Sequence, residues 1–193
     1  MFKESLKIFG AVTLAFVIIS LVSLATPGNH QSIIPDTSQA QVIAADTVQA
    51  DIFPISRVID GDTVVVDMNG TNETVRLIGV NTPETVDPRK PVQCFGKEAS
   101  NFVKSMLAGK SVRLQSDPTQ ADRDKYGRLL RYVYLDDVLV NEEIISSGYG
   151  FEYTYDIPYQ FQKEFRASEG YARSGSLGLW APTTCNGQLK PAS

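Results

Sequence analysis

The sequence predicts a small α+β domain, mainly β, in which five short strands close into a Greek-key barrel and about three helices cover it. Segments rich in Val and Ile alternate with Asp-Gly and Asn-Gly pairs, which favour tight hairpin turns. After the third such segment the apolar residues change to helical spacing. The length of 193 residues leaves room for one domain and an additional segment.

Three strands are expected first, over residues 52–59, 63–68 and 74–80. Asp60-Gly61 and Asn69-Gly70 separate them, and residues of these types tolerate the positive φ of tight turns. Strands joined in this way form an antiparallel meander. Two more strands, over residues 111–115 and 129–135, complete the five that a small barrel needs.

Helices are expected between and after the later strands. Residues 97–107 carry apolar side chains at i, i+3, i+4, i+7 and i+8, with Gly109 beyond their end. Asn141 is expected to cap a second helix that Gly148 stops. A third helix is expected over residues 158 to about 173.

The first 50 residues differ from the rest in composition. Lysines in residues 1–7 precede an uncharged apolar run over 8–25, the pattern of an export signal. As a helix this run would span roughly 27 Å, close to the thickness of a bilayer core. Residues 1–25 are therefore expected to be a signal peptide, or a membrane anchor through 8–25. Residues 26–50, rich in Gln, Ala, Thr and Ser, are expected to be a disordered linker or propeptide.

These segments predict a protein that is secreted or anchored on the outer face of the cell membrane. The folded domain is expected over residues 51–182, with a C-terminal tail over 183–193. The two cysteines of the sequence are Cys94 and Cys185, and an oxidising compartment favours one disulfide between them. Two separate free thiols are the alternative.

Histidine content and charge exclude several classes of function. The one histidine, His30, lies in the expected linker, so the domain has none for a general base, a catalytic triad or a zinc site. The net charge of −4 argues against a protein that holds nucleic acid by bulk charge alone. An enzyme with a local basic site remains compatible with it.

Oxygen-bearing residues cluster at the ends of the first three strands, in Asp60-Gly61-Asp62 and in Asn81-Thr82-Pro83-Glu84. Such oxygens suit a hard cation. Pro83 favours an extended conformation at Thr82, which could turn the Thr82 carbonyl outward. Taken alone, Asp60-Gly61-Asp62 is most often only a hairpin turn, and an ordinary strand-ending turn is the alternative for Asn81-Thr82-Pro83-Glu84.

Two arginines lie near these carboxylates in the sequence. Arg76 interrupts an apolar strand, so its guanidinium must leave the barrel or be paired; a solvated arginine on the outer face is the alternative. Arg128 ends the basic loop 123–128, whose Lys125 and Tyr126 suit a phosphate and a stacked base. A solvated charged loop is the alternative there.

Taken together and in this order, three stretches resemble the signature motifs of the staphylococcal nuclease (thermonuclease) family. They are Val58-Ile-Asp-Gly-Asp-Thr-Val64, Arg76-Leu-Ile-Gly-Val-Asn-Thr-Pro-Glu84 and Asp124-Lys-Tyr-Gly-Arg-Leu129. Shorter matches occur at residues 96–99, 140–142 and 177–180, so the resemblance covers about 52–181. It implies an OB-fold barrel with three helices and a Ca²⁺-dependent nuclease that acts on DNA and RNA and leaves 3′-phosphate ends.

The resemblance also implies a metal site. Asp62 and Asn81 match side-chain ligands of Ca²⁺, Thr82 matches a ligand through its backbone carbonyl, and Asp60 matches an outer-shell acid. Many family members have Asp where this chain has Asn81. The site therefore has one negative charge fewer, and weaker Ca²⁺ binding is expected.

The remaining matches imply catalytic and substrate-binding roles. Glu84 matches the residue assigned as general base or as the group that positions the attacking water. Arg76 and Arg128 match the pair that binds the scissile phosphate and stabilises its transition state. The residues that match contacts to a terminal phosphate or a nucleotide are Lys125, Tyr126, Tyr153 and Tyr155.

Two other classes of function compete with a nuclease. A non-catalytic OB-fold module that binds nucleic acid or protein would be expected to lack at least one of the four groups Asp62, Arg76, Glu84 and Arg128, and all are present. A structural or adhesive surface protein gives no reason for an arginine inside an apolar strand. A monomer acting on DNA and RNA is the expectation.

Overall fold

A computed structural model of the chain describes residues 51–192. Its barrel strands are β1 (Ile52–Asp60), β2 (Thr63–Met68), β3 (Thr71–Leu77), β5 (Ser111–Gln115) and β6 (Leu129–Leu135). Three short strands are β4 (Val80–Asn81), β7 (Val138–Leu139) and β8 (Phe151–Glu152). The helices are α1 (Gly96–Leu107), α2 (Val140–Ser146) and α3 (Gln162–Ser174), followed by the 3₁₀ turn η1 (Gly178–Trp180).

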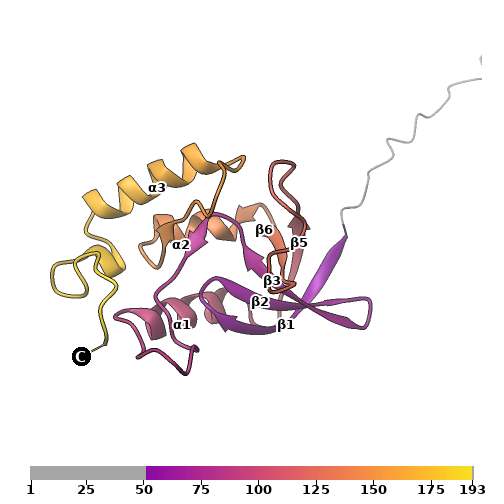
Figure 1. The fold of residues 1–193 in the computed structure, drawn as a ribbon, viewed down its shortest axis with the longest axis horizontal. Helices are drawn as coiled ribbons and strands as arrows, with labels where there is room; N and C mark the ends of the chain where they lie inside the picture. The colour runs from indigo at the N-terminus through magenta and orange to yellow at the C-terminus, as the bar shows by residue number, and fades with distance from the viewer. Residues whose placement is uncertain (1–50, 193) are drawn as a thin grey trace, which may run out of the picture. The chain divides into compact units, whose positions relative to one another are not determined.

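The strands close into the predicted five-stranded barrel (Figure 1). β1, β2 and β3 form the antiparallel meander, and β1 also pairs with β5, which pairs with β6. A parallel pairing of β3 with β6 closes the ring. Register irregularities in β1 between Ile55 and Arg57 and between Val58 and Asp60 bend this strand, so that its two halves pair with different neighbours.

The third strand starts and ends earlier than the expected 74–80. Asn69-Gly70 alone makes the turn, so pairing with β2 resumes at Thr71 despite the polar residues that follow. β3 ends at Leu77 because Gly79 has a φ of +75°, and a Cβ at Gly79 would lie 2.5 Å from the ring of Tyr159. The chain therefore leaves the barrel here and continues towards Asn81.

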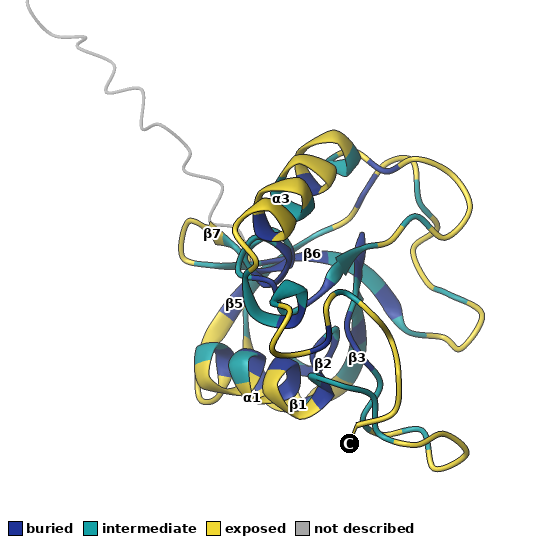
Figure 2. Ribbon diagram, turned by 90° about the vertical axis from the view of Figure 1, so that its left-hand side faces the viewer, coloured by how far each residue is buried: buried dark blue, intermediate teal, exposed yellow. Residues whose placement is uncertain are grey.

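The barrel interior is apolar; α1 and α2 pack against the barrel strands and α3 packs on α2, each with one face buried (Figure 2). Val64, Val66 and Val75 are completely buried inside the barrel. The expected apolar face of the first helix is confirmed, since Val103 and Leu107 of α1 are also completely buried. This packing gives a rigid frame for the loops that leave the strand ends.

The predicted N-cap of the second helix is wrong. α2 begins at Val140 with Leu139 as its N-cap, and Asn141 lies within the helix and is fully buried. Its Oδ1 accepts a hydrogen bond from Val133 N at 2.9 Å, and its Nδ2 donates to Ile78 O at 2.9 Å. The amide thus joins α2 to β6 and to the turn after β3, instead of capping its own helix.

The third helix starts at Gln162, later than the expected Pro158. The backbone N–H of Gln160 donates to the carboxylate of Asp117 at 2.7 Å, and Tyr132 Oη donates to the same carboxylate at 2.5 Å. The bond to Gln160 holds residues 160–161 in a turn, and the helix begins after it at Gln162.

The disulfide between Cys94 and Cys185 is present. Residues 183–192, expected as a tail, lie against the segment before α1: Lys190 O accepts from Cys94 N at 2.8 Å, and Ala192 N donates to Val92 O at 2.8 Å. The expected signal or anchor (1–25) and linker (26–50) lie outside the described residues. Within residues 51–192, no helix has the length and apolarity to cross a membrane.

Candidate active site

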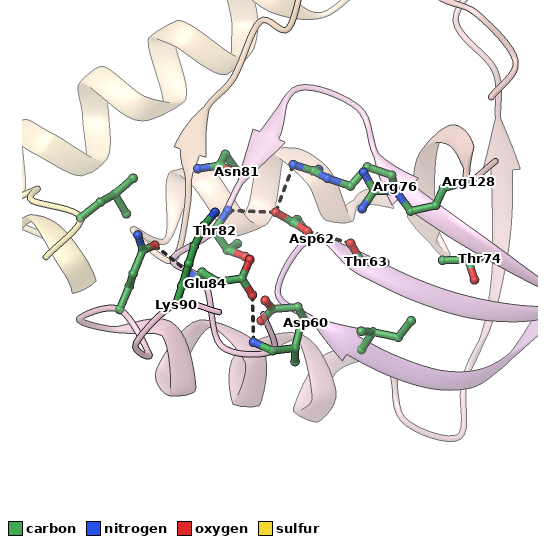
Figure 3. Close-up of a pocket in the computed structure, with 14 residues that line it drawn as sticks. Asp60, Asp62, Thr63, Thr74, Arg76, Asn81, Thr82, Glu84, Lys90 and Arg128 are labelled. Atoms are coloured by element: carbon green, nitrogen blue, oxygen red, sulfur yellow. Dashed lines mark hydrogen bonds and ion pairs between the residues drawn. The ribbon is translucent and has the colours of Figure 1, made fainter. Parts of the chain in front are cut away.

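A cavity of about 510 Å³ opens where the turn before β2, the end of β3 and the chain after β4 meet (Figure 3). Its lining includes all seven predicted metal and catalytic residues: Asp60, Asp62, Arg76, Asn81, Thr82, Glu84 and Arg128. The structure therefore brings together side chains that come from three separate stretches of the sequence.

Asp62 is the centre of this group. Its Oδ2 lies 3.1 Å from Nη2 of Arg76 and accepts a hydrogen bond from Thr82 N at 3.1 Å, while Oδ1 accepts from Thr63 Oγ1 at 2.8 Å. Arg76 also donates from Nη1 to Leu77 O at 2.7 Å. Both side chains of the ion pair are only 13 % exposed, so Arg76 is paired inside the cavity and the solvated alternative is wrong.

The turn before β2 lies very close to Thr82. A Cβ built on Gly61 would lie 2.8 Å from Cγ2 and Oγ1 of Thr82, so glycine is required for this approach. Thr82 is 4 % exposed, and its buried Oγ1 has no hydrogen-bond partner among the described residues. The close contact aligns Thr82 with Asp62 on one wall of the cavity.

The residues on this wall fit a hard cation. Asp62, Asn81 and Thr82 offer only oxygen donors, the kind that Ca²⁺ and Mg²⁺ prefer, and the buried hydroxyl of Thr82 lacks a partner. No three His, Cys, Asp or Glu side chains converge on a metal site within residues 51–192. The donor set is thus one carboxylate with neutral oxygens, which is a low negative charge for a divalent ion.

The carboxylates of Asp60 and Glu84 lie beside Asp62 in the cavity (Figure 3). Asp60 accepts hydrogen bonds from Gly61 N at 2.9 Å and Thr85 Oγ1 at 2.8 Å. Burial raises the pKa of the Asp60 carboxyl above its usual value of 3.8, against the lowering effect of these two bonds, and the nearby carboxylates of Asp62 and Glu84 raise it further. The raised pKa of Asp60 therefore comes mainly from burial, with a smaller contribution from the two neighbouring carboxylates.

The carboxylate of Glu84 is fixed by the chain that follows it. Its Oε1 accepts hydrogen bonds from Val86 N at 2.8 Å and Asp87 N at 3.0 Å. The other oxygen, Oε2, accepts no hydrogen bond from the described residues. One oxygen thus orients the group while the second is available to a water or substrate molecule.

Arg128 reaches the cavity from the loop before β6. Asp124 holds its guanidinium, with Nε at 2.7 Å and Nη2 at 2.6 Å from Oδ2. The parallel pairing of β3 with β6 places Leu130 beside Arg76, so the loop that carries Arg128 enters β6 close to the strand that carries Arg76. Two guanidinium groups at one cavity can bind the oxygens of a phosphate.

The four predicted substrate-binding residues gather next to Arg128 on the surface. Lys125 Nζ lies 5.2 Å from the ring centre of Tyr126 and 6.0 Å from that of Tyr155. The rings of Tyr153 and Tyr155 are 6.4 Å apart, and Tyr126 and Tyr155 are more than 70 % exposed. This cluster of Lys125, Tyr126, Tyr153 and Tyr155 offers exposed ring faces beside a cation.

Among the cavity residues that the sequence did not indicate are Lys90, Gln93 and Leu189. Lys90 and Gln93 lie in a loop without a motif, and Leu189 lies in the expected tail. The cysteine pair was the one feature of the sequence that could have indicated that the tail lies near the site, because a bond from Cys94 to Cys185 brings the tail close to Gln93. Asn141 was noted in the sequence, but its role in joining α2 to the barrel was not.

Comparisons with known proteins agree with this geometry. The family model described as "Staphylococcal nuclease homologue" matches residues 74–182. A thermonuclease of Staphylococcus hyicus is 40 % identical over 67 % of this chain and 75 % of its own length. One from Staphylococcus intermedius is 41 % identical over 69 % and 78 %. Endonuclease YncB of Bacillus subtilis is 39 % identical over 66 % and 60 %.

The family match runs from within β3 to just beyond η1 and includes the cavity residues Arg76, Asn81, Thr82, Glu84 and Arg128, whereas Asp60 and Asp62 precede it. Nucleases of this type are phosphodiesterases with nucleic acid as substrate, and the family's nucleases are metal-dependent. This chain belongs to the staphylococcal nuclease family and is a nuclease.

Proposed function

We propose that this protein is an exported Ca²⁺-dependent nuclease that hydrolyses DNA and RNA and leaves 3′-phosphate ends. The observation that carries the proposal is the convergence of Asp62, Arg76, Glu84 and Arg128 on one cavity. A phosphodiester gains negative charge on its phosphoryl oxygens in the transition state. The cavity supplies the groups that stabilise such charge, together with a base.

The two arginines stabilise the developing charge. Arg76 is largely desolvated and is oriented by its ion pair with Asp62, and Arg128 is oriented by its ion pair with Asp124. Little reorganisation of the two side chains is therefore needed when phosphate binds. Each guanidinium can donate two parallel hydrogen bonds to phosphate oxygens. The pair thereby favours the transition state over the ground state if its bonds strengthen as charge develops.

Glu84 takes the role of general base. The sequence has a single histidine, His30, outside the described domain, so a carboxylate must accept the proton of the attacking water. Oε1 of Glu84 is fixed by two backbone N–H groups, and Oε2 is available to a water molecule. When bound at Asp62, Asn81 and Thr82, Ca²⁺ would supply positive charge for the phosphoryl oxygens.

The exposed cluster Lys125, Tyr126, Tyr153 and Tyr155 accounts for a broad choice of substrate. Aromatic faces stack on any base, and a lysine binds phosphate without reading sequence. Both DNA and RNA therefore fit this surface. The polarity of cleavage to 3′-phosphate ends rests on the likeness to thermonucleases.

Export is part of the proposal. Residues 8–25 would serve as signal or as an anchor in contact with the membrane, and the protein would act as a monomer that is secreted or held outside the cell. The disulfide of the described domain supports this, because such bonds persist in oxidising compartments.

The test is cleavage of single-stranded DNA, duplex DNA and RNA by the purified full-length chain, with Ca²⁺ and with excess chelator. Cleavage of all three only with Ca²⁺, giving ends that a polymerase extends after phosphatase treatment, is the expected result. Binding without cleavage by a folded, disulfide-intact sample would contradict the proposal and favour a non-catalytic binding module.

A further inference from the structure

The C-terminal segment, residues 183–192, runs beside the loop that carries Glu84. It descends from the end of η1 to the residues before α1 (Figure 1). Leu189 of this segment lines the same cavity as Glu84. The segment lies outside the three motifs and beyond the residues matched by the family model.

Gln93 holds the backbone of Glu84 from two sides. Its side-chain Oε1 accepts a hydrogen bond from Glu84 N at 2.8 Å, and its own backbone N–H donates to Glu84 O at 2.9 Å. Gln93 O in turn accepts from Gly96 N at 3.0 Å, at the start of α1. Glu84 is thus fixed through its side chain by Val86 and Asp87, and through its main chain by Gln93.

The C-terminal segment fixes Gln93. Gln93 forms a β-bridge with Pro191, and hydrogen bonds join the residues on either side of it, Val92 and Cys94, to the same segment. The disulfide from Cys94 to Cys185 adds a covalent link. Backbone bonds and one covalent bond therefore connect the C-terminal segment, through one glutamine, to the proposed base.

We propose that Gln93 is a positioning residue for Glu84, and that residues 189–192 of the C-terminal segment belong to the active site because they hold Gln93 and line the cavity through Leu189. The expected loss of catalysis on removing the Gln93 side chain rests on the proposed function. The expected change in the position of residues 84–87 does not.

The size of the effect follows from the geometry that a general base needs. A base must lie within hydrogen-bond reach of its proton, and a misplacement of about 1 Å can cost about 100-fold in rate. Both hydrogen bonds from Gln93 to Glu84 involve the backbone of Glu84, so Gln93 acts on the reaction through the position of Glu84. Its loss is therefore expected to lower kcat and leave KM nearly unchanged.

The experiment compares three variants of the full-length chain. Gln93→Met keeps the size of the side chain and removes the acceptor for Glu84 N, whereas Gln93→Glu keeps an acceptor oxygen. Gln188→Met is the matched control, since Gln188 is an exposed glutamine of the same segment. Steady-state kinetics on DNA with Ca²⁺ gives kcat and KM, and hydrogen exchange followed by mass spectrometry reports on the amides of residues 84–87.

In Gln93→Met, kcat is expected to fall by about 10- to 100-fold with KM within about twofold, and the amides of residues 84–87 are expected to exchange faster. Gln93→Glu is expected to recover both kcat and slow exchange. Gln188→Met is expected to change neither. Unchanged kcat and unchanged exchange in Gln93→Met would overturn the proposal. If the parent chain does not cleave, the proposed function fails; exchange alone then decides whether Gln93 holds this loop.

A truncation tests the part played by the segment. A chain ending at Gln188 keeps the disulfide and loses Leu189, Lys190, Pro191 and Ala192, and a chain lacking only Ser193 is its control. The same fall in kcat and the same faster exchange are expected in the first truncation only. Normal kcat in the chain ending at Gln188 would exclude residues 189–192 from the active site.

Discussion

Asp62 and Arg76 form an ion pair of 3.1 Å inside the cavity, and each side chain is only 13 % exposed. The pair arises from the β2–β3 hairpin, whose register sets Thr63 opposite Arg76 and so brings the preceding Asp62 within reach. The proposed metal ligand and the proposed phosphate-binding arginine are therefore oriented by each other. A single substitution at either residue will disturb both functions.

Arg76→Lys tests the arginine as a phosphate-binding group. Lysine keeps a positive charge near Asp62 but cannot donate two parallel hydrogen bonds, so kcat is expected to fall by about 10²- to 10³-fold. Arg57→Lys, at an exposed position of β1, is the matched control. Steady-state kinetics with thermal unfolding checks the result. Near-parent kcat in a folded Arg76→Lys protein would remove Arg76 from the mechanism.

Asn81→Asp tests the charge of the metal site. The substitution gives the donor set a second carboxylate, and more ligand charge tightens Ca²⁺, so a Kd lower by about tenfold is expected. Asn101→Asp adds the same charge to the exposed side of α1 and should leave the Kd unchanged. Calorimetric titration with Ca²⁺ measures the Kd of both variants and of the parent. Equal affinity in Asn81→Asp and the parent would place Asn81 outside the metal site.

Gly61→Ala tests the close contact behind Asp62. The new methyl group would lie 2.8 Å from the buried side chain of Thr82, whose β-branched shape cannot turn away freely. We expect a loss of about 1–3 kcal/mol in the free energy of unfolding and weaker Ca²⁺ binding. Gly170→Ala is the control, because a Cβ there meets nothing within 4 Å and alanine favours the α3 helix. Unchanged stability and affinity in Gly61→Ala would show that the contact has no role.

Asp117 predicts a pH dependence of stability. Burial alone would raise its pKa, but hydrogen bonds from Tyr132, Gln160 N and Thr119 outweigh burial and hold the pKa below its usual 3.8. The folded state therefore binds its proton less readily than the unfolded chain. This stabilisation is present above pH 3.8 and is lost as the pH falls through the lowered folded value.

Asp117→Asn is accordingly expected to lower the free energy of unfolding by about 1–3 kcal/mol near neutral pH, and by less in acid. Asp137→Asn, at an exposed turn, should change neither value. Urea unfolding at about pH 7 and about pH 3 measures both. A constant difference between Asp117→Asn and the parent across this range would contradict the assignment.

Local signals in the sequence predicted most of the barrel. Asn69-Gly70 makes the hairpin between β2 and β3, and apolar spacing predicted α1, because both depend on neighbours in the chain. The start of α2 and the start of α3 were misplaced for the opposite reason. Asn141 bonds to Ile78 and Val133 across the fold, and Asp117 holds Gln160 from a distant loop.

The same distinction applies to the site. Asp62, Arg76, Glu84 and Arg128 could be found because each stands in a recognisable motif, and the structure brings them to one cavity. Gln93 carries no motif, and its hydrogen bonds to Glu84 exist only because the C-terminal segment fixes the residues around it. Such contributions depend on long-range backbone contacts that residue type does not reveal.

Glu84 is the proposed catalytic base of a Ca²⁺-dependent nuclease, and Glu84→Gln tests this role most directly. Glutamine keeps an acceptor oxygen for Val86 N and Asp87 N but cannot take a proton from water. Glu98→Gln, on the exposed side of α1, is the matched control. Single-turnover cleavage of DNA with saturating Ca²⁺ is expected to slow by about 10²- to 10⁴-fold in Glu84→Gln alone, with the fold intact. Cleavage at the parent rate by Glu84→Gln would contradict the account.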